Sequence, residues 1–189
     1  MTAPDPLGFT VRPLDPLTDI PLVHRWVTHP KSAFWQMPDF GPEDVARAYT
    51  AITEHPDHHA FIGHDPSGEP VFLMESYDPA RVELVGLYDA RPGDVGMHFL
   101  VAPTDTPVHG FTRAVITAVL RTLFADPATE RIVVEPDVRN TAVQALNTYA
   151  GFSIAERIRT PEKEAFLSFC TREAFEHSAA MADRPAVGR

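Results

Sequence analysis

The stretch Gly93-Asp94-Val95-Gly96-Met97-His98-Phe99-Leu100-Val101-Ala102-Pro103 decides the fold that this sequence predicts. Its apolar part, 96–101, is typical of a strand, and a loop over 104–110 separates it from a helix over 111–124 with apolar residues near one face. A strand that leads into a helix N-terminus collects free backbone N–H groups and the positive end of the helix dipole, which favours an anion. An ordinary strand-to-helix connection with a turn glycine, Gly110, is the alternative interpretation.

The rest of the chain extends this unit on both sides. Strands are predicted over 9–14, 60–63, 71–74, 82–88 (irregular), 96–101, 131–135, 152–158 and 165–171, and helices over 20–27, 42–54, 111–124 and from the cap Asn140 to about 150. This order predicts an α/β (α+β) domain over 9–176, a mixed sheet with helices on both faces. Residues 1–8 and 177–189 are expected to be flexible termini.

Composition narrows the class of protein. The 189 residues are 44% hydrophobic and 22% charged, which indicates one globular domain. The formal net charge of -10 argues against nucleic acid or an anionic membrane as a partner, since both need a basic surface. The single cysteine, Cys170, excludes a disulfide within the chain, and residues 1–8 lack the features of a signal peptide. We therefore expect a cytoplasmic protein that does not span a membrane.

The second informative stretch is Glu135-Pro136-Asp137-Val138-Arg139-Asn140, followed by Leu146-Asn147 and Gly151-Phe152. This succession of a strand, an Asn, a helix and Gly-Phe resembles the acyl-acceptor half of the GNAT superfamily of acyl-CoA N-acyltransferases. The strand, loop and helix around Gly110 are similar to the pyrophosphate-binding half of the same superfamily. Together with 93–103, these motifs more narrowly resemble the hydroxamate-siderophore branch: aerobactin-, mycobactin- and desferrioxamine-type acyltransferases. The resemblance covers 9–176 and implies a single-domain GNAT fold with a mixed, mostly antiparallel sheet of about seven strands.

The resemblance also implies the site residues. The active-site His of the family falls on His98 and its Asp on Asp137. The residues implied to bind acyl-CoA, with acetyl-CoA or succinyl-CoA as donor, are Phe99, Leu100, Val101, Val108, His109, Gly110, Phe111, Thr112, Arg113, Asn140 and Asn147. The loop has one glycine where the superfamily usually has two small residues, and Asn147 stands where many members have a Tyr acid. The group that protonates the leaving thiolate is therefore not assigned. No metal-ligand spacing is present.

The chemistry of amine acylation fits these residue types. The attacking nitrogen must be unprotonated and oriented on the thioester carbonyl, and a group must take a proton as the C–N bond forms. A histidine with a pKa near neutrality suits that role, and an Asp can fix its tautomer or hold the substrate. A backbone N–H from Phe99 to Leu100 is expected to polarise the thioester oxygen.

An aromatic loop over 29–38 is expected to roof the acceptor pocket. The predicted substrate-binding residues are Trp26, His29, Phe34, Trp35, Met37 and Glu75. Glu75 is expected to contact the distal ammonium group of a diamine substrate, and a solvent-facing position on its strand is the alternative. For Trp26 the alternative is packing in the core. Lys163 is interpreted as a turn lysine.

The resemblance to the hydroxamate-siderophore branch implies transfer of an acetyl or succinyl group to the hydroxylamine nitrogen of an N-hydroxylated diamine or lysine, such as N-hydroxycadaverine. The product is a hydroxamate for siderophore biosynthesis. An enzyme similar to aminoglycoside 6′-N-acetyltransferases and a non-catalytic acyl-CoA-binding module remain as alternatives. The chain is expected to be a monomer or a homodimer.

Overall fold

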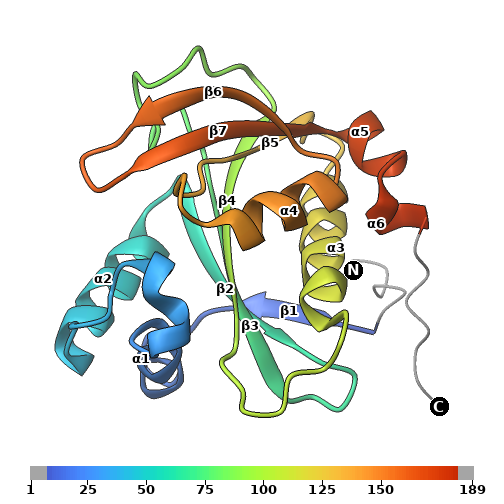
Figure 1. Ribbon diagram of the computed structural model, residues 1–189. Coiled ribbons are helices and arrows are strands. Elements are labelled where there is room, and N and C mark those ends of the chain that lie inside the picture. Colours follow the sequence, from blue (N-terminus) through green and yellow to red (C-terminus); the bar gives the residue numbers. More distant parts are fainter. Residues whose placement is uncertain (1–7, 183–189) are drawn as a thin grey trace.

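The computed structural model describes residues 8–182 and contains a seven-stranded mixed sheet in the order β1-β2-β3-β4-β5-β7-β6 (Figure 1). The strands are β1 (Thr10–Pro13), β2 (His58–His64), β3 (Pro70–Tyr77), β4 (Asp94–Val101), β5 (Arg131–Val134), β6 (Ser153–Arg159) and β7 (Glu164–Thr171). The helices are α1 (Ile20–Val27), the 3-10 helix η1 (Pro30–Trp35), α2 (Pro42–Glu54), α3 (Phe111–Phe124), α4 (Thr141–Tyr149), α5 (Arg172–Glu176) and α6 (Ala179–Ala182). The predicted fold class is confirmed.

The centre of the sheet opens between β4 and β5. These two strands pair in parallel over only three residues, Asp94–Gly96 with Arg131–Val133. All other neighbouring strands pair antiparallel. Because β4 continues to Val101 while β5 ends at Val134, the second half of β4 has β3 on one side and an edge without a strand on the other.

Helices pack against both faces of the sheet, because side chains alternate between the faces along each strand. On one face α1 and α2 cover β2 and β3, with Ile62, Leu73 and Tyr49 in a common core. On the other face α3 packs with the C-terminal helices in a second core that includes Met97, Ile116 and Phe175. Figure 1 shows α1 and α2 grouped together on the side away from α3, α4, α5 and α6.

One predicted strand and one predicted loop differ from the observed structure. Residues 82–88 form turns and not a strand, because Glu83 takes a left-handed conformation with φ 60°. This loop instead covers one end of the sheet with the buried Leu84, which packs with Tyr77 and Leu167. The aromatic loop contains the helix η1, whose first turn is capped by His29 through a bond from the Lys31 N–H.

The predicted flexible tail is wrong for 177–182. Thr171 caps α5 by accepting a bond from the Ala174 N–H at 3.1 Å, and the chain continues into α6. Phe175 and Ala180 are buried in the core beside α3, so apolar contacts hold this segment. Residues 183–189 and 1–7 lie outside the described residues, so the expected flexibility of both ends stays a prediction there.

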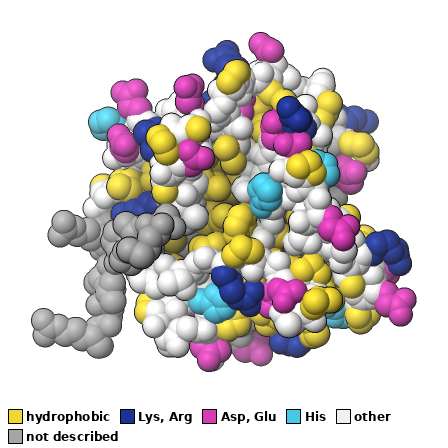
Figure 2. All heavy atoms as spheres, turned by 180° about the vertical axis from the view of Figure 1, so that it is seen from behind, with side chains coloured by type: hydrophobic (Ala, Val, Ile, Leu, Met, Phe, Trp, Pro, Cys, Tyr) yellow, Lys and Arg dark blue, Asp and Glu magenta, His cyan; other side chains and the backbone are white. Residues whose placement is uncertain are grey.

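The described surface matches the acidic composition. On the face that Figure 2 views, acidic and basic side chains are interspersed. Within residues 8–182, no helix combines the length and apolar character needed to cross a membrane. The same part of the chain holds no group of three His, Cys, Asp or Glu side chains placed to bind a metal ion.

Candidate active site

His98 lies at the middle of the sheet because of the pairing of β3 with β4. In this register Glu75 is directly opposite His98, and opposed residues on an antiparallel pair share a face. Glu135 comes directly after β5, two residues beyond Val133, so its side chain points to the same face of the sheet as Val133. It approaches His98 from the opposite side of β4 to Glu75. Three strands thus place one imidazole between two carboxylates.

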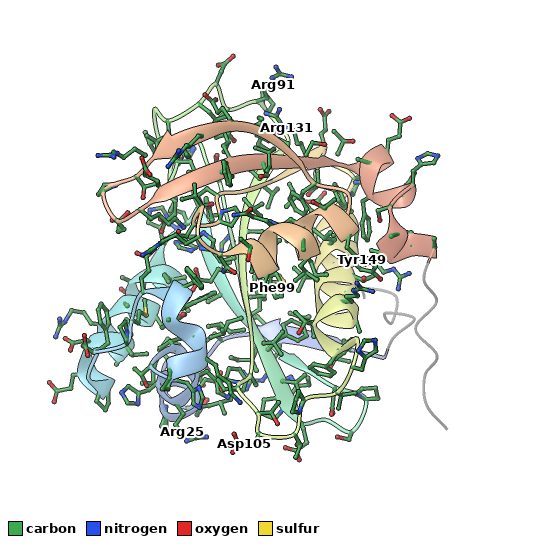
Figure 3. The ribbon with its side chains drawn as sticks, in the orientation of Figure 1. Arg25, Arg91, Phe99, Asp105, Arg131 and Tyr149 are labelled. Atoms are coloured by element: carbon green, nitrogen blue, oxygen red, sulfur yellow. The ribbon has the colours of Figure 1, made fainter. Side chains whose placement is uncertain are left out.

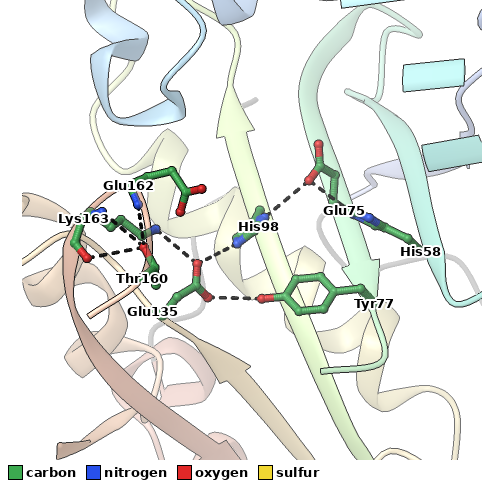
Figure 4. Close-up of polar contacts among 8 residues, drawn as sticks. All are labelled: His58, Glu75, Tyr77, His98, Glu135, Thr160, Glu162 and Lys163. Carbon is green, nitrogen blue, oxygen red and sulfur yellow. Dashed lines mark hydrogen bonds and ion pairs between the residues drawn. The ribbon is translucent and has the colours of Figure 1, made fainter. Parts of the chain in front are cut away.

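Both ring nitrogens of His98 contact a carboxylate (Figure 4). Nε2 is 2.9 Å from Glu135 Oε1, and Nδ1 is 3.4 Å from Glu75 Oε2. Both glutamates are buried, whereas 26% of the His98 side chain is exposed. Tyr77 and Trp35 pack their rings near the imidazole, with ring centroids 5.2 and 6.2 Å away. The imidazole is therefore the accessible member of an otherwise buried polar cluster.

Each carboxylate has further partners on its far side. Tyr49 O–H donates to Glu75 at 3.0 Å and itself accepts from Trp35 Nε1–H at 3.1 Å. His58 Nε2 is 3.6 Å from Glu75.

Tyr77 O–H donates to Glu135 at 3.1 Å, and Lys163 Nζ donates to the other oxygen of Glu135 at 3.2 Å. Lys163 comes from the turn between β6 and β7, and its side chain is mostly buried. Glu135 therefore lies between His98 of β4 and Lys163 of the β6–β7 turn.

The two carboxylates raise the pKa of His98. Burial lowers the pKa of His98, but the attraction of Glu135 and Glu75 outweighs it and raises that pKa to about 10. Burial raises the pKa of Glu75 and of Glu135, and their hydrogen-bonding and charged neighbours more than offset this and bring each pKa to about 2. This differs from the expected pKa near neutrality, because the strand register supplies two carboxylates that the sequence neighbours of His98 do not indicate.

Asp137 does not contact His98, so its predicted role in fixing the tautomer is wrong. Its carboxylate instead accepts three bonds from Arg139: from the backbone N–H at 2.8 Å and from Nε and Nη2 at 2.9 and 2.6 Å. These bonds lower the pKa of Asp137 to about 2. The physical reason is the backbone after β5: Phe166 N–H donates to Pro136 O, and Asp137 bridges to Ala165 of β7, away from β4.

Asp137 nevertheless lies beside a surface cavity. The cavity has a volume of about 390 Å³ and is lined by Asp137, Val138, Arg139, Glu162, Lys163 and Glu164. Lys163 connects this cavity to Glu135 and so to His98. The alternative role of Asp137, holding the substrate, stays a prediction.

The free edge of β4 offers backbone groups to a ligand. Ala102 N–H donates to Val71 O at 2.9 Å. Because the groups of an antiparallel strand alternate in direction, the N–H and C=O of Phe99 and Val101 face away from β3, toward the opening beside β5. The same alternation turns the Leu100 backbone toward β3, so its predicted part in polarising a ligand is wrong.

The N-terminus of α3 lies after this edge. Gly110 is the N-cap with φ 79°, and it provides no side-chain cap. Val108, His109, Gly110 and Thr112 are exposed, as expected for a binding loop. The Phe111 ring instead packs against Phe9 at 5.8 Å, and its N–H donates to Val108 O, so core packing explains this side chain.

Arg113 lies in the first turn of α3, Asn140 is the N-cap of α4, and Asn147 lies near the end of α4. Arg113 lies over the ring of Tyr149, 4.6 Å from its centroid, and Figure 3 shows Tyr149 and Phe99 on the α3 and α4 side of the sheet. Asn140 caps α4 by accepting a bond from the Val143 N–H at 3.2 Å. Asn147 is 5% exposed, and its Nδ2 has no hydrogen-bond partner among the described residues. A buried amide donor without a partner is costly, so this side chain fits a ligand carbonyl.

The predicted acceptor residues separate into two groups. Trp35 contacts His98 and Tyr49, and Phe34 is 46% exposed beside it in η1. Trp26 is buried in the core under α1, and Met37 packs against that core, which favours the packing interpretation for Trp26. His29 caps η1. Glu75 is buried, so it does not face solvent. Its carboxylate contacts His98 and is therefore not free to bind the distal ammonium group of a substrate.

Residues 15–160 match the acetyltransferase (GNAT) domain family. This chain belongs to the GNAT family. It is 29% identical over 145 residues to the lysine N-acyltransferase MbtK of Mycobacterium sp. (strain MCS), which is 76% of this chain and 59% of that relative. It is 28% identical over 158 residues to an N-hydroxyputrescine acetyltransferase of Acinetobacter baumannii, covering 83% and 74% of the two chains. The chain thus spans less than two thirds of the first of these relatives.

Several solved structures share the fold. An uncharacterised protein from Bacillus halodurans has a TM-score of 0.82 at 22% identity, covering 89% of this chain and 86% of that one. AAC(6′)-Ib in complex with paromomycin and acetyl-CoA has a TM-score of 0.79 at 22% identity, covering 89% and 96%.

Four residues of the candidate site were not predicted: Glu135, Lys163, Tyr77 and Tyr49. The alternation of side chains along a strand could have indicated two of them. Glu135 lies two residues after Val133, and Tyr77 lies two residues after Glu75, so each pair points to the same face of the sheet. Lys163 is a turn residue as expected, with its N–H bonded to Thr160 Oγ1. Its contact with Glu135 joins distant elements and has no local signal in the sequence.

Proposed function

We propose that this GNAT protein is an N-acyltransferase that moves an acetyl or succinyl group from acyl-CoA to a hydroxylamine nitrogen. The acceptor is an N-hydroxylated diamine or lysine, such as N-hydroxycadaverine, and the product is a hydroxamate for siderophore biosynthesis. The observation that carries the proposal is the position of His98 on β4. Its side chain lies among polar groups on one face, while the next residues along β4 present their backbone to the opening beside β5.

The donor fits the groups around this opening. The backbone groups of Phe99 and Val101 match the amides of a pantetheine arm, and the unpaired Nδ2 of Asn147 adds a donor. The uncapped N-terminus of α3 and the Arg113 side chain suit a pyrophosphate. Acyl-CoA bound there supplies a thioester, and the residues of this chain orient it.

The acceptor side favours a nitrogen that arrives uncharged. The buried carboxylates Glu75 and Glu135 already have cationic partners, so an alkylammonium finds no free counter-charge beside His98. A hydroxylamine is a weaker base than an alkylamine and is neutral at physiological pH. The name of one relative, an N-hydroxyputrescine acetyltransferase, supports this class of acceptor, and the name of the other, a lysine N-acyltransferase, supports an amine acceptor in general.

An acceptor panel tests the proposal. Purified protein is offered acetyl-CoA or succinyl-CoA with N-hydroxycadaverine, N6-hydroxylysine, lysine or kanamycin, and free coenzyme A is measured. We expect turnover with a hydroxylamine above that with lysine. Turnover of kanamycin alone would show an aminoglycoside-type enzyme. Binding of acyl-CoA without turnover of any acceptor would support a binding module.

His98→Gln is expected to lower kcat by at least ~100-fold, the size of a proton-transfer or charge contribution at a reacting centre. The measurement is steady-state release of coenzyme A. Arg159→Gln is the control, because Arg159 is an exposed side chain of β6. Rates of His98→Gln close to the wild type would remove His98 from the site.

Asp137→Asn is likewise expected to lose at least ~100-fold in rate if its carboxylate holds the acceptor. Arg139→Gln is the matched variant, since it breaks the same ion pair and keeps the carboxylate. A selective loss in Asp137→Asn supports substrate binding by Asp137. Equal losses in both variants would mean that the ion pair only shapes the loop.

A further inference from the structure

The polar cluster around His98 is balanced in charge within the protein. Glu75 and Glu135 contribute two negative charges, and the cationic groups that face them are His98 and Lys163. The remaining polar groups that face the cluster are the Tyr77 and Tyr49 hydroxyls, Trp35 and His58, contributed by β3, α2, η1 and β2. The two carboxylates and these two cations sum to zero, although the carboxylates themselves are buried.

A histidine between two carboxylates is a donor on both sides. Its Nε2 is 2.9 Å from Glu135, and its Nδ1 is 3.4 Å from Glu75. If the ring were neutral, one nitrogen would direct a lone pair at a carboxylate oxygen, which is repulsive. If the ring is an imidazolium, both contacts are charge-assisted hydrogen bonds. The geometry therefore favours the cation.

We infer that Glu135 and Glu75 are positioning residues that hold His98 as an imidazolium. Lys163 balances the second carboxylate, and the neutral site that results selects acceptor nitrogens without charge. An imidazolium has no free lone pair, and both N–H groups of His98 already donate to carboxylates, so His98 offers a positive charge and does not serve as the base. This inference rests on the proposed function for its substrate class, whereas the charge state of His98 stands on the structure alone.

Lys163 explains how the selection against ammonium works. Its Nζ is 3.2 Å from Glu135 Oε1, the same oxygen that His98 contacts. A cation in this position occupies the place where a substrate ammonium would otherwise pair with Glu135. Lys163 is 16% exposed and comes from the β6–β7 turn, which also lines the neighbouring cavity. Removal of its charge leaves the carboxylates in excess and attracts ammonium groups.

Histidine NMR tests the charge state without any substrate. Long-range 1H–15N spectra at pH 7.5 report whether both ring nitrogens of His98 carry a proton, and His98→Gln identifies the signal. We expect a doubly protonated ring in the wild type and a ring that titrates at least about one unit lower in Glu135→Gln. Lys163→Met should keep the ring protonated. A neutral His98 ring in the wild type at this pH overturns the inference, whatever the substrate is.

Competition by cadaverine tests the selection. The ratio of its inhibition constant to the KM of N-hydroxycadaverine compares two ligands that differ only at the reacting end. We expect this ratio to fall about tenfold in Lys163→Met, since loss of a neighbouring charge shifts ionisation by a unit or more. Lys163→Arg should restore the wild-type ratio, and Arg159→Gln, a lost cation in the same hairpin, should not change it.

The outcomes separate the two proposals. A protonated His98 with no turnover of any acceptor rejects the proposed function and keeps the charge state. An unchanged ratio in Lys163→Met rejects the selection by Lys163. A changed ratio together with an unchanged His98 signal in Glu135→Gln rejects Glu135 as the group that holds the imidazolium.

Discussion

At the scale of single residues, the neighbours of His98 matter more than His98 itself. A strand histidine alone is compatible with a base, an acid or a structural residue. Glu75 and Glu135 lie on either side of its ring and remove the free lone pair that a base needs. The His98 side chain and its two carboxylates thus act as one unit, and substitutions among them are expected to be non-additive.

The stability of the protein should depend on pH through His98. Its folded pKa of about 10 lies above the ordinary 6.5. The stabilisation is therefore complete below pH 6.5 and is lost as the pH rises through about 10. The free energy of unfolding by urea should decline over this range, and His98→Gln should remove part of the decline. His59→Gln, at an exposed position of β2, is the control; an identical decline in His98→Gln would contradict the expectation.

At the scale of elements, β4 performs two tasks with alternate residues. His98 points its side chain toward the face with α1 and α2, and Phe99 and Val101 present backbone groups to the opening beside β5. The short pairing with β5 makes this possible, since a longer ladder would consume those groups. One strand thereby brings the proposed acceptor side and the proposed donor side within a residue of each other.

Gly96→Ala should disturb the site through packing. A Cβ on Gly96 would lie 2.1 Å from the Tyr77 ring, and Tyr77 O–H donates to Glu135. The ring must shift, so we expect a loss of about 1–3 kcal/mol in stability and a weaker contact to Glu135. Urea unfolding and the His98 NMR signal measure the two effects. Tyr77→Phe is the control, because it removes only the hydroxyl; a fully stable Gly96→Ala protein would contradict this account.

At the scale of the whole molecule, two layers of helices fix the sheet and leave its centre open. The layer with α1 and α2 carries Trp35 and Tyr49 to the polar cluster. The other layer carries α3 to the free edge of β4, and α5 and α6 close its far end. Ala180 of α6 is 1% exposed in that core.

Ala180→Glu should show that the C-terminal helices belong to the domain. A buried carboxylate without a partner is expected to cost more than about 2 kcal/mol in the free energy of unfolding. Ala179→Glu is the matched control, because the adjacent Ala179 is exposed. Thermal unfolding of both variants measures the difference, and equal melting temperatures would mean that α6 contributes little to the core.

Local patterns predict the elements well. The helices over 20–27, 42–54 and 111–124 have the predicted bounds, because proline at the first turn and helical periodicity are local properties. The strand over 82–88 was wrong, because apolar residues there pack from a loop with a left-handed Glu83. The tail over 177–182 was wrong, because short helices at a chain end depend on tertiary contacts.

The sequence by itself determined most of the strands, the four longer helices, the Asn140 cap and the position of His98 on a strand. These follow from periodicity, turn residues and the Glu-Pro-Asp motif, all of which act over a few residues. Only the tertiary structure decided that Glu135 and Glu75, and not Asp137, bind the imidazole, and that Lys163 completes the cluster. The physical reason is that strand register and the β6–β7 turn bring these charges together across long stretches of chain, and charge balance depends on distance in space.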